Sequence, residues 1–151
     1  MKKYELTDDT ITVGGRILHR IKALKSFSDV EEGDLGGYVE KEDNLDHSGE
    51  AWVSGNAWVY GNARVYGNAR VSGDARVSGE NDYAAAKGFG REYRTTTFFR
   101  LQDGGIGVRC GCFCGTLEEF REKVKETHKE SKMGKEYLML ADLMEYKFKN
   151  A

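Results

Sequence analysis

Residues 45–80 repeat a six-residue unit, and most copies follow the pattern A-x-V-x-G-[ND]. The copies are LDHSGE, AWVSGN, AWVYGN, ARVYGN, ARVSGD and ARVSGE. A unit of even length keeps the same positions of an extended chain on the same face in every copy. Repetition at a fixed period of six residues is typical of parallel β-helices. The repeat therefore predicts that this segment folds as a short parallel β-helix.

The residue types at each position of the repeat agree with this prediction. Small Ala suits a narrow interior, and β-branched Val suits extended backbone. The Gly-Asn and Gly-Asp pairs supply the positive-φ backbone that turns the chain. The residues expected to point inward are Ala51, Ala57, Ala63, Ala69, Ala75, Val53, Val59, Val65, Val71 and Val77.

These units resemble the hexapeptide-repeat, or left-handed β-helix, family, which places an aliphatic residue inward and a small residue two positions before it. The resemblance covers roughly residues 38–83. It implies a left-handed coil with three units per turn, and many members of the family are acyltransferases or trimers. We therefore expect a mainly β fold, with a short left-handed parallel β-helix, an N-terminal β-meander cap and a C-terminal ββαα appendage.

We expect four segments along the chain: a β-meander cap at residues 1–37, the repeat at 38–83, a linker at 84–92 and the ββαα appendage at 93–151. Thr116 and Glu119 have the spacing of a capping box at the start of a helix. A second helix is expected at about Met133–Phe148, with one apolar face. The meander and the appendage are expected to cover the ends of the β-helix, because exposed strand edges promote aggregation.

Aromatic and basic side chains occupy the outward positions of the repeat. With 18 residues per coil, the expected stacked pairs are Trp52 with Arg70, Trp58 with Arg76 and Asp46 with Arg64. Aromatic rings stack on nucleobases, and Arg binds phosphate through two N–H groups. The surface predicted to bind a ligand or partner consists of Trp52, Trp58, Tyr60, Arg64, Tyr66, Arg70 and Arg76. The alternative is that these side chains only cover the β-helix or bury a trimer interface.

The three histidines do not indicate a catalytic site. An acyltransferase of this kind needs a His as general base in a cleft between subunits. His47 falls at an inward position and is expected to be a core or capping residue, and His19 is expected to be packed. His128 ends the first C-terminal helix, where a cation interacts favourably with the helix dipole. We predict no catalytic residue.

The three cysteines are Cys110, Cys112 and Cys114. Along a strand they would share one face, whereas zinc sites usually pair cysteines across a tight two-residue turn and need four ligands. Reduced structural thiols are the expectation, and the sequence leaves their role open. No metal and no cofactor are predicted.

Charge and hydropathy restrict the partners. The formal net charge of the 151 residues is −2, so we expect no DNA partner. The N-terminus lacks an apolar signal region, and the longest apolar stretches are too short to span a membrane. We expect a cytoplasmic protein with no membrane partner.

The layout as a whole, including the tail GCFCGTLEEF at Gly111–Phe120, also resembles small phage and prophage proteins of unknown role. From this resemblance and the repeat surface we expect a non-catalytic oligomeric binding protein of phage origin. It would be a homotrimer by preference, and would sequester a nucleotide-like small molecule or block a host defence protein. The alternatives are a small hexapeptide-repeat acyltransferase and a structural assembly module.

Overall fold

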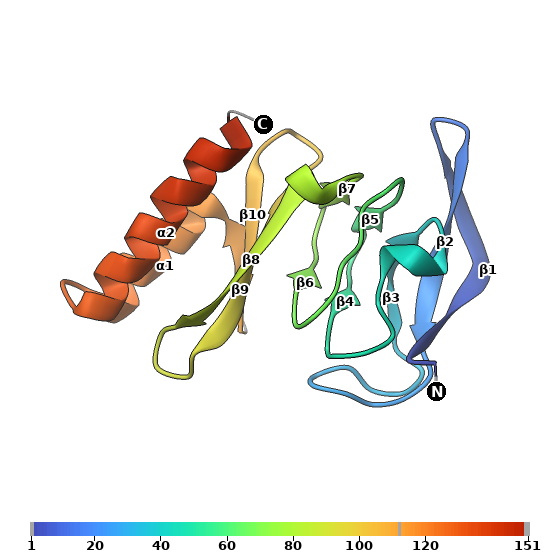
Figure 1. The fold of residues 1–151 in the computed structure, drawn as a ribbon, viewed down its shortest axis with the longest axis horizontal. Coiled ribbons are helices and arrows are strands. Elements are labelled where there is room, and N and C mark those ends of the chain that lie inside the picture. The colour runs from blue at the N-terminus through green and yellow to red at the C-terminus, as the bar shows by residue number, and fades with distance from the viewer. Residues whose placement is uncertain (1, 112, 150–151) are drawn as a thin grey trace.

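The computed structural model describes residues 2–111 and 113–149, which form an elongated stack of layers (Figure 1). An N-terminal β-hairpin lies at one end. The repeat segment, which we define as residues 45–80, follows it, and a four-stranded antiparallel sheet comes next. Two helices cover the far side of that sheet, so the two ends of the molecule differ in secondary structure.

The N-terminal meander is confirmed. Strand β1 (Tyr4–Val13) pairs antiparallel with β2 (Arg16–Ala23), and β2 pairs antiparallel with β3 (Leu35–Val39). The register of β1 and β2 shifts between Leu6 and Thr10, where the polar TDDT sequence interrupts the apolar alternation.

The repeat segment contains four strands of two residues each. They are β4 (Trp52–Val53), β5 (Trp58–Val59), β6 (Arg70–Val71) and β7 (Arg76–Val77). β4 pairs in parallel with β6, and β5 with β7, so that residues 18 apart lie side by side as expected. β5 also pairs in parallel with β3, which makes β1-β2-β3-β5-β7 one mixed sheet and leaves β4-β6 as a sheet of its own.

The prediction of a mainly β fold built on a short left-handed parallel β-helix is wrong. The repeat supplies strands of only two residues, and the third side carries a single bridge between Leu45 and Val65. Because β3 draws β5 and β7 into the meander sheet, the repeat does not form a solenoid of its own. The fold is mixed: a five-stranded mixed sheet, a four-stranded antiparallel sheet, a two-stranded parallel sheet and two C-terminal helices.

The interior of the repeat segment follows the sequence pattern. All ten Ala and Val side chains that were expected to point inward are at most 2% exposed. Five of the six turn glycines of the repeat take positive φ, as expected, and Gly79 in the last unit is extended. The five are Gly49, Gly55, Gly61, Gly67 and Gly73. The prediction of which residues face the core is therefore confirmed, although the architecture around them differs.

The C-terminal sheet has four strands, not the two expected for a ββαα appendage. They are β8 (Tyr83–Phe89), β9 (Arg94–Arg100), β10 (Ile106–Cys110) and β11 (Phe113–Thr116), in the order β11-β10-β9-β8. The predicted linker at residues 84–92 is also wrong, since most of it lies in β8. Ala84 and Ala86 pack against the core under the helices, so this Ala-rich segment is held as an edge strand.

The two helices are confirmed. Helix α1 (Leu117–His128) begins at the predicted capping box, in which Thr116 Oγ1 accepts from the Glu119 N–H. Helix α2 (Lys132–Lys149) buries the predicted apolar face: Tyr137, Leu140, Ala141, Met144 and Phe148. No helix in the part of the chain that the structure describes is long and apolar enough to cross a membrane.

Strand β9 lies between two hydrophobic cores. Phe99 packs with the core of the meander and the repeat, and the adjacent Phe98 packs with the core under the helices. Ala75 forms an antiparallel bridge with Leu101, which follows β9. As expected, the meander covers one end of the repeat segment and the C-terminal part covers the other.

Candidate functional site

Trp52 does not lie on an accessible surface, contrary to expectation. Its side chain is 3% exposed. The ring of Tyr4 meets it edge-on at a centroid distance of 6.4 Å, and Phe27 does so at 5.4 Å. Phe27 belongs to the loop between β2 and β3, which folds over this side of the repeat segment. A ligand cannot reach Trp52 unless that loop moves.

The predicted stacking of Arg76 on Trp58 is confirmed. The guanidinium carbon of Arg76 lies 3.7 Å from the centroid of the Trp58 ring. Its Nη1 donates to the backbone oxygens of Asn56 and Ala75, at 3.0 and 2.9 Å. Burial lowers the pKa of Arg76 from its ordinary value. The guanidinium is therefore held against the sheet and is not free to follow a ligand.

The row of cations and rings continues onto the meander. Tyr38, on β3, lies beside Trp58 on β5. The guanidinium carbon of Arg20 lies 4.4 Å from the centroid of the Tyr38 ring. Sequence reasoning missed Arg20 and Tyr38 because they lie outside the repeat. Their position shows that the five-stranded sheet, rather than the repeat alone, builds this row.

Arg64 and Tyr66 flank Val65, on the side of the repeat segment that carries neither tryptophan, whereas Tyr60 directly follows β5 and lies near Arg76. Arg64 forms the expected ion pair with Asp46, with 3.7 Å between Nη2 and Oδ2. Tyr66 is 55% exposed, and Tyr60 is half-buried. The structure thus divides the seven predicted residues among different sides of the repeat segment and does not gather them into one site.

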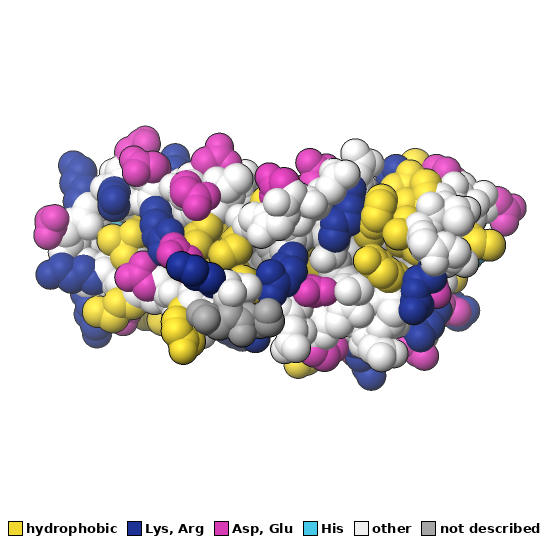
Figure 2. Space-filling view, turned by 90° about the horizontal axis from the view of Figure 1, so that it is seen from above, with side chains coloured by type: hydrophobic (Ala, Val, Ile, Leu, Met, Phe, Trp, Pro, Cys, Tyr) yellow, Lys and Arg dark blue, Asp and Glu magenta, His cyan; other side chains and the backbone are white. Residues whose placement is uncertain are grey.

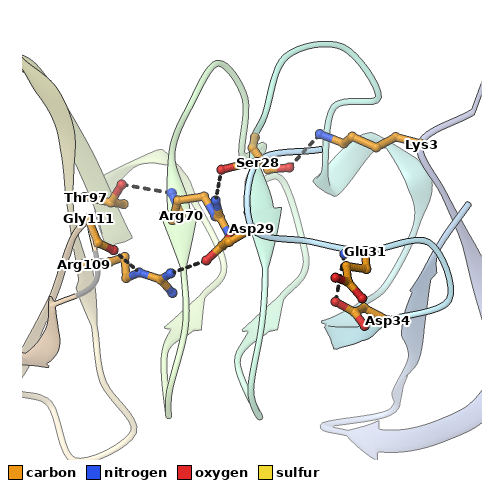
Figure 3. A network of polar contacts seen from close by, with 10 residues as sticks. Lys3, Ser28, Asp29, Glu31, Asp34, Arg70, Thr97, Arg109 and Gly111 are labelled. Carbon is orange, nitrogen blue, oxygen red and sulfur yellow. Dashed lines mark hydrogen bonds and ion pairs between the residues drawn. The ribbon is translucent and has the colours of Figure 1, made fainter. Parts of the chain in front are cut away.

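Arg70 leads to a site that the sequence did not predict. Its Nη2 donates to Oδ1 of Asp29 at 2.5 Å, and its backbone N–H donates to Oγ1 of Thr97 on β9 at 2.9 Å. Arg109 on β10 donates from Nη2 to the other oxygen of Asp29 at 3.1 Å and from Nε to the Gly111 carbonyl at 2.9 Å. Two guanidinium groups from different sheets therefore hold one carboxylate (Figure 3).

The electrostatics of this triad favour the charged form of Asp29. The hydrogen bond from Arg70, together with the positive charges of Arg70 and Arg109, lowers the pKa of Asp29. The Asp29 side chain is 60% exposed, whereas those of Arg70 and Arg109 are only 16% and 17% exposed. The two guanidinium groups are thus fixed by the fold, and the carboxylate covers them from the solvent side.

The triad forms one wall of a pocket of about 390 Å³ between the repeat segment and the C-terminal sheet. We call it the cationic pocket. Its charged lining consists of four cations and two acids, an excess of two positive charges on a chain whose net charge is −2. These residues are Arg70, Lys87, Arg94, Arg109, Asp29 and Glu50. Figure 2 shows a face of the molecule on which acidic and basic side chains are mixed.

No sequence signal marks this pocket. Asp29 and Arg70 are 41 positions apart, and Asp29 and Arg109 are 80 positions apart. They come from a loop, a repeat strand and a hairpin strand, and no local motif links them. Only the packing of β9 against the repeat segment brings them together.

The histidines make structural contacts. His47 stacks on Tyr4 at a centroid distance of 4.2 Å, accepts from the Lys3 backbone N–H at 3.1 Å and lies 2.8 Å from Glu42. His19 is half-buried, with Nδ1 3.0 Å from the Thr7 carbonyl oxygen. His128 is the last residue of α1, as predicted.

The cysteines do not assemble a metal site among the residues described. Cys110 is partly buried and Cys114 is exposed, and both are free thiols. The Sγ of Cys114 lies 3.2 Å from Oγ of Ser72. Cys112 lies outside the described residues. Within residues 2–111 and 113–149, no group of three or more His, Cys, Asp or Glu side chains is placed to hold a metal ion.

No protein-family model matches this chain, and no curated protein matches it in sequence.

Proposed function

We propose that this protein is a non-catalytic binding protein that holds a small phosphate-bearing, nucleotide-like molecule in the cationic pocket. The observation that supports the proposal is the Arg70–Asp29–Arg109 triad, in which two fixed guanidinium groups already bind an anion. A phosphate group offers oxygens of the same charge and similar spacing to those of a carboxylate, and Arg is well suited to both.

The size and lining of the pocket agree with such a ligand. Pockets for small molecules commonly measure about 300–1,000 Å³, and this one measures about 390 Å³. Lys87 provides a cation for a further phosphate group, and Arg94, which also lines the pocket, forms an ion pair with Glu92. Tyr93, which is 64% exposed, lies on the pocket and offers an aromatic face on which a base can stack.

The proposal keeps the nucleotide-like ligand expected from the sequence but moves its site. Arg70 is the one residue of the predicted surface that lines the cationic pocket. Trp52 is buried, and Trp58 with Arg76 lies on a different sheet. The ligand contacts we propose therefore come from the C-terminal sheet and the loop between β2 and β3 as much as from the repeat.

Isothermal titration calorimetry at low ionic strength tests the proposal with four probes: pyrophosphate, ADP, ADP-ribose and a cyclic nucleotide. We expect at least one probe to bind, with an affinity that falls as salt rises. Arg109→Gln should weaken binding at least about tenfold, because it removes one of the two fixed guanidinium groups. Arg64→Gln is the matched control, since Arg64 is exposed and lies outside the pocket.

Two outcomes would contradict the proposal. The first is that none of the four probes binds to the wild type. The second is that Arg64→Gln weakens binding as much as Arg109→Gln, which would make the effect one of overall charge. Thermal melts of both variants should stay close to that of the wild type, because a lost fold would also abolish binding.

A further inference from the structure

The loop between β2 and β3 carries a tight turn of four residues, which we call the 27–30 turn. Its end residues exchange two backbone hydrogen bonds: the Phe27 N–H donates to the Val30 carbonyl at 2.9 Å, and the Val30 N–H donates to the Phe27 carbonyl at 2.8 Å. Ser28 and Asp29 form the exposed tip. Because this pair of bonds closes the turn, we expect its four residues to move as one body.

The tip of the turn lines the cationic pocket and supplies it with an anion. Asp29 binds Arg70 with one carboxylate oxygen and Arg109 with the other. Oγ of Ser28 also accepts from Nη1 of Arg70, at 3.3 Å. Figure 3 shows both guanidinium groups directed toward this tip. An anion that binds to the same two guanidinium groups therefore competes with Asp29 of the chain itself.

The other end of the turn covers Trp52. The ring of Phe27 lies against the buried Trp52 ring, and Nζ of Lys3 lies 5.0 Å from the centroid of the Phe27 ring. Phe27 itself is not among the residues that line the cationic pocket. It can therefore influence a ligand in the pocket only through the position of the turn.

The backbone at the tip is in an unfavourable conformation. Ser28 has a φ of 50°, in the left-handed region that a residue with a Cβ atom rarely adopts. Contacts at both ends of the turn hold it there: the ion pairs of Asp29 on one side and the packing of Phe27 on the other. Loss of the ion pairs removes one of these two restraints and lets the backbone strain relax.

We infer that the 27–30 turn is a lid on the cationic pocket, which an anion opens by taking the place of Asp29 and which uncovers Trp52 as it opens. The inference rests on the proposed function and adds how that site is regulated. In the closed state the protein carries its own anion, so the apparent affinity for a ligand is reduced by the fraction of molecules that are closed. The lid therefore selects for a polyanion such as a diphosphate, which brings more negative charge than the single carboxylate it displaces.

Fluorescence of Trp52 reports the position of the lid. The chain has two tryptophans, so Trp58→Phe leaves Trp52 as the only one. In this background pyrophosphate should shift the emission to longer wavelength and increase quenching by acrylamide, because Phe27 leaves the Trp52 ring. Sodium chloride at equal ionic strength is the control and should cause neither change. Asp29→Asn in the same background should show part of both changes without any ligand, because the charge that holds the tip is gone.

Calorimetric titration of Phe27→Ala with pyrophosphate tests the coupling from outside the pocket. The substitution removes packing that exists only when the lid is closed, so it should tighten binding by at least about threefold. Leu35→Ala is the matched control: Leu35 is 59% exposed, begins β3 shortly after the same turn and lies outside the pocket. Its affinity should equal that of the wild type. Thermal melts establish that both variants are folded at the temperature of the titration.

The outcomes separate the lid from the proposed function. Calorimetric binding of pyrophosphate that leaves the emission and quenching of Trp52 unchanged would overturn the lid and leave the proposed function standing. A folded Phe27→Ala variant that binds no more tightly than the wild type would do the same, as would an Asp29→Asn variant whose Trp52 stays as protected as in its parent. If none of the four probes of the proposed function binds, both proposals fall.

Discussion

The guanidinium carbon of Arg76 lies 3.7 Å from the ring centroid of Trp58, its neighbour on the adjacent parallel strand 18 residues earlier. A double-mutant cycle with Trp58→Leu and Arg76→Gln should give a coupling energy of about 1–2 kcal/mol, because the contact is partly desolvated. Urea unfolding of the wild type, the two single variants and the double variant measures this coupling energy.

The control is the exposed ion pair of Arg64 and Asp46, with 3.7 Å between its charged atoms. The cycle with Arg64→Gln and Asp46→Asn should give about 0.5 kcal/mol or less. A coupling for Trp58 and Arg76 that is no larger than this value would mean that their proximity contributes nothing beyond a surface contact.

The interior of the repeat segment gives a second prediction. Val65 is fully buried, so Val65→Asp would place an unpaired carboxylate among Ala and Val side chains. We expect a loss of at least about 3 kcal/mol of unfolding free energy, or no folded protein at all. Arg64→Gln, at the adjacent exposed position, should change stability by about 0.5 kcal/mol or less. Thermal melts that rank the two variants in the opposite order would show that the assignment of inward positions is wrong.

The sequence predicted those parts of the fold that depend on local pattern. The period of six identified the buried Ala and Val positions and the stacking of residues 18 apart. Thr116 and Glu119 marked the start of α1, because a capping box is a contact between near neighbours. These features need no information about distant parts of the chain.

The parts that failed depend on distant contacts. β3 adds to β5 and turns the repeat into part of a mixed sheet, which no feature of the repeat itself could indicate. Tyr83–Phe89 is a strand because β9 offers a pairing edge, although its composition resembles that of a linker. The cationic pocket was missed for the same reason, since Asp29 and Arg109 come together only in the folded chain.

Gly37 tests the close approach of β3 to the repeat segment. A Cβ atom at this position would lie 2.7 Å from the Ala57 carbonyl oxygen and 2.8 Å from Cγ1 of Val53. Gly37→Ala should therefore cost about 1–3 kcal/mol of stability, because the neighbouring backbone must shift. Gly79→Ala is the matched control, as its Cβ would meet no atom within 4 Å. Equal melting temperatures for the two variants would argue against the tight packing of β3.

Lys3 gives a pH-dependent prediction. It is fully buried, its Nζ donates to the Ala51 carbonyl at 2.6 Å, and burial lowers its pKa from 10.5 to about 8. Between these two values the unfolded chain binds more protons than the folded chain, so this residue's contribution to stability rises with pH.

Lys3→Met removes that titration from both states. The stability of the wild type relative to this variant should therefore increase between about pH 8 and about pH 9.5, by up to about 1.4 kcal/mol per pH unit. Urea denaturation of both proteins at each pH measures the difference. A difference that stays constant or shrinks as pH rises would contradict the lowered pKa assigned to the buried Lys3.

The most direct test of the cationic pocket uses two variants that should change the affinity for an anion in opposite directions. Asp29 occupies both fixed guanidinium groups, so a bound anion must share or displace its carboxylate. Calorimetric titration with pyrophosphate should therefore show tighter binding for Asp29→Asn than for the wild type, and weaker binding for Arg109→Gln. If both substitutions weaken binding alike, or if neither changes it, the Arg70–Asp29–Arg109 triad is not the anion-binding site.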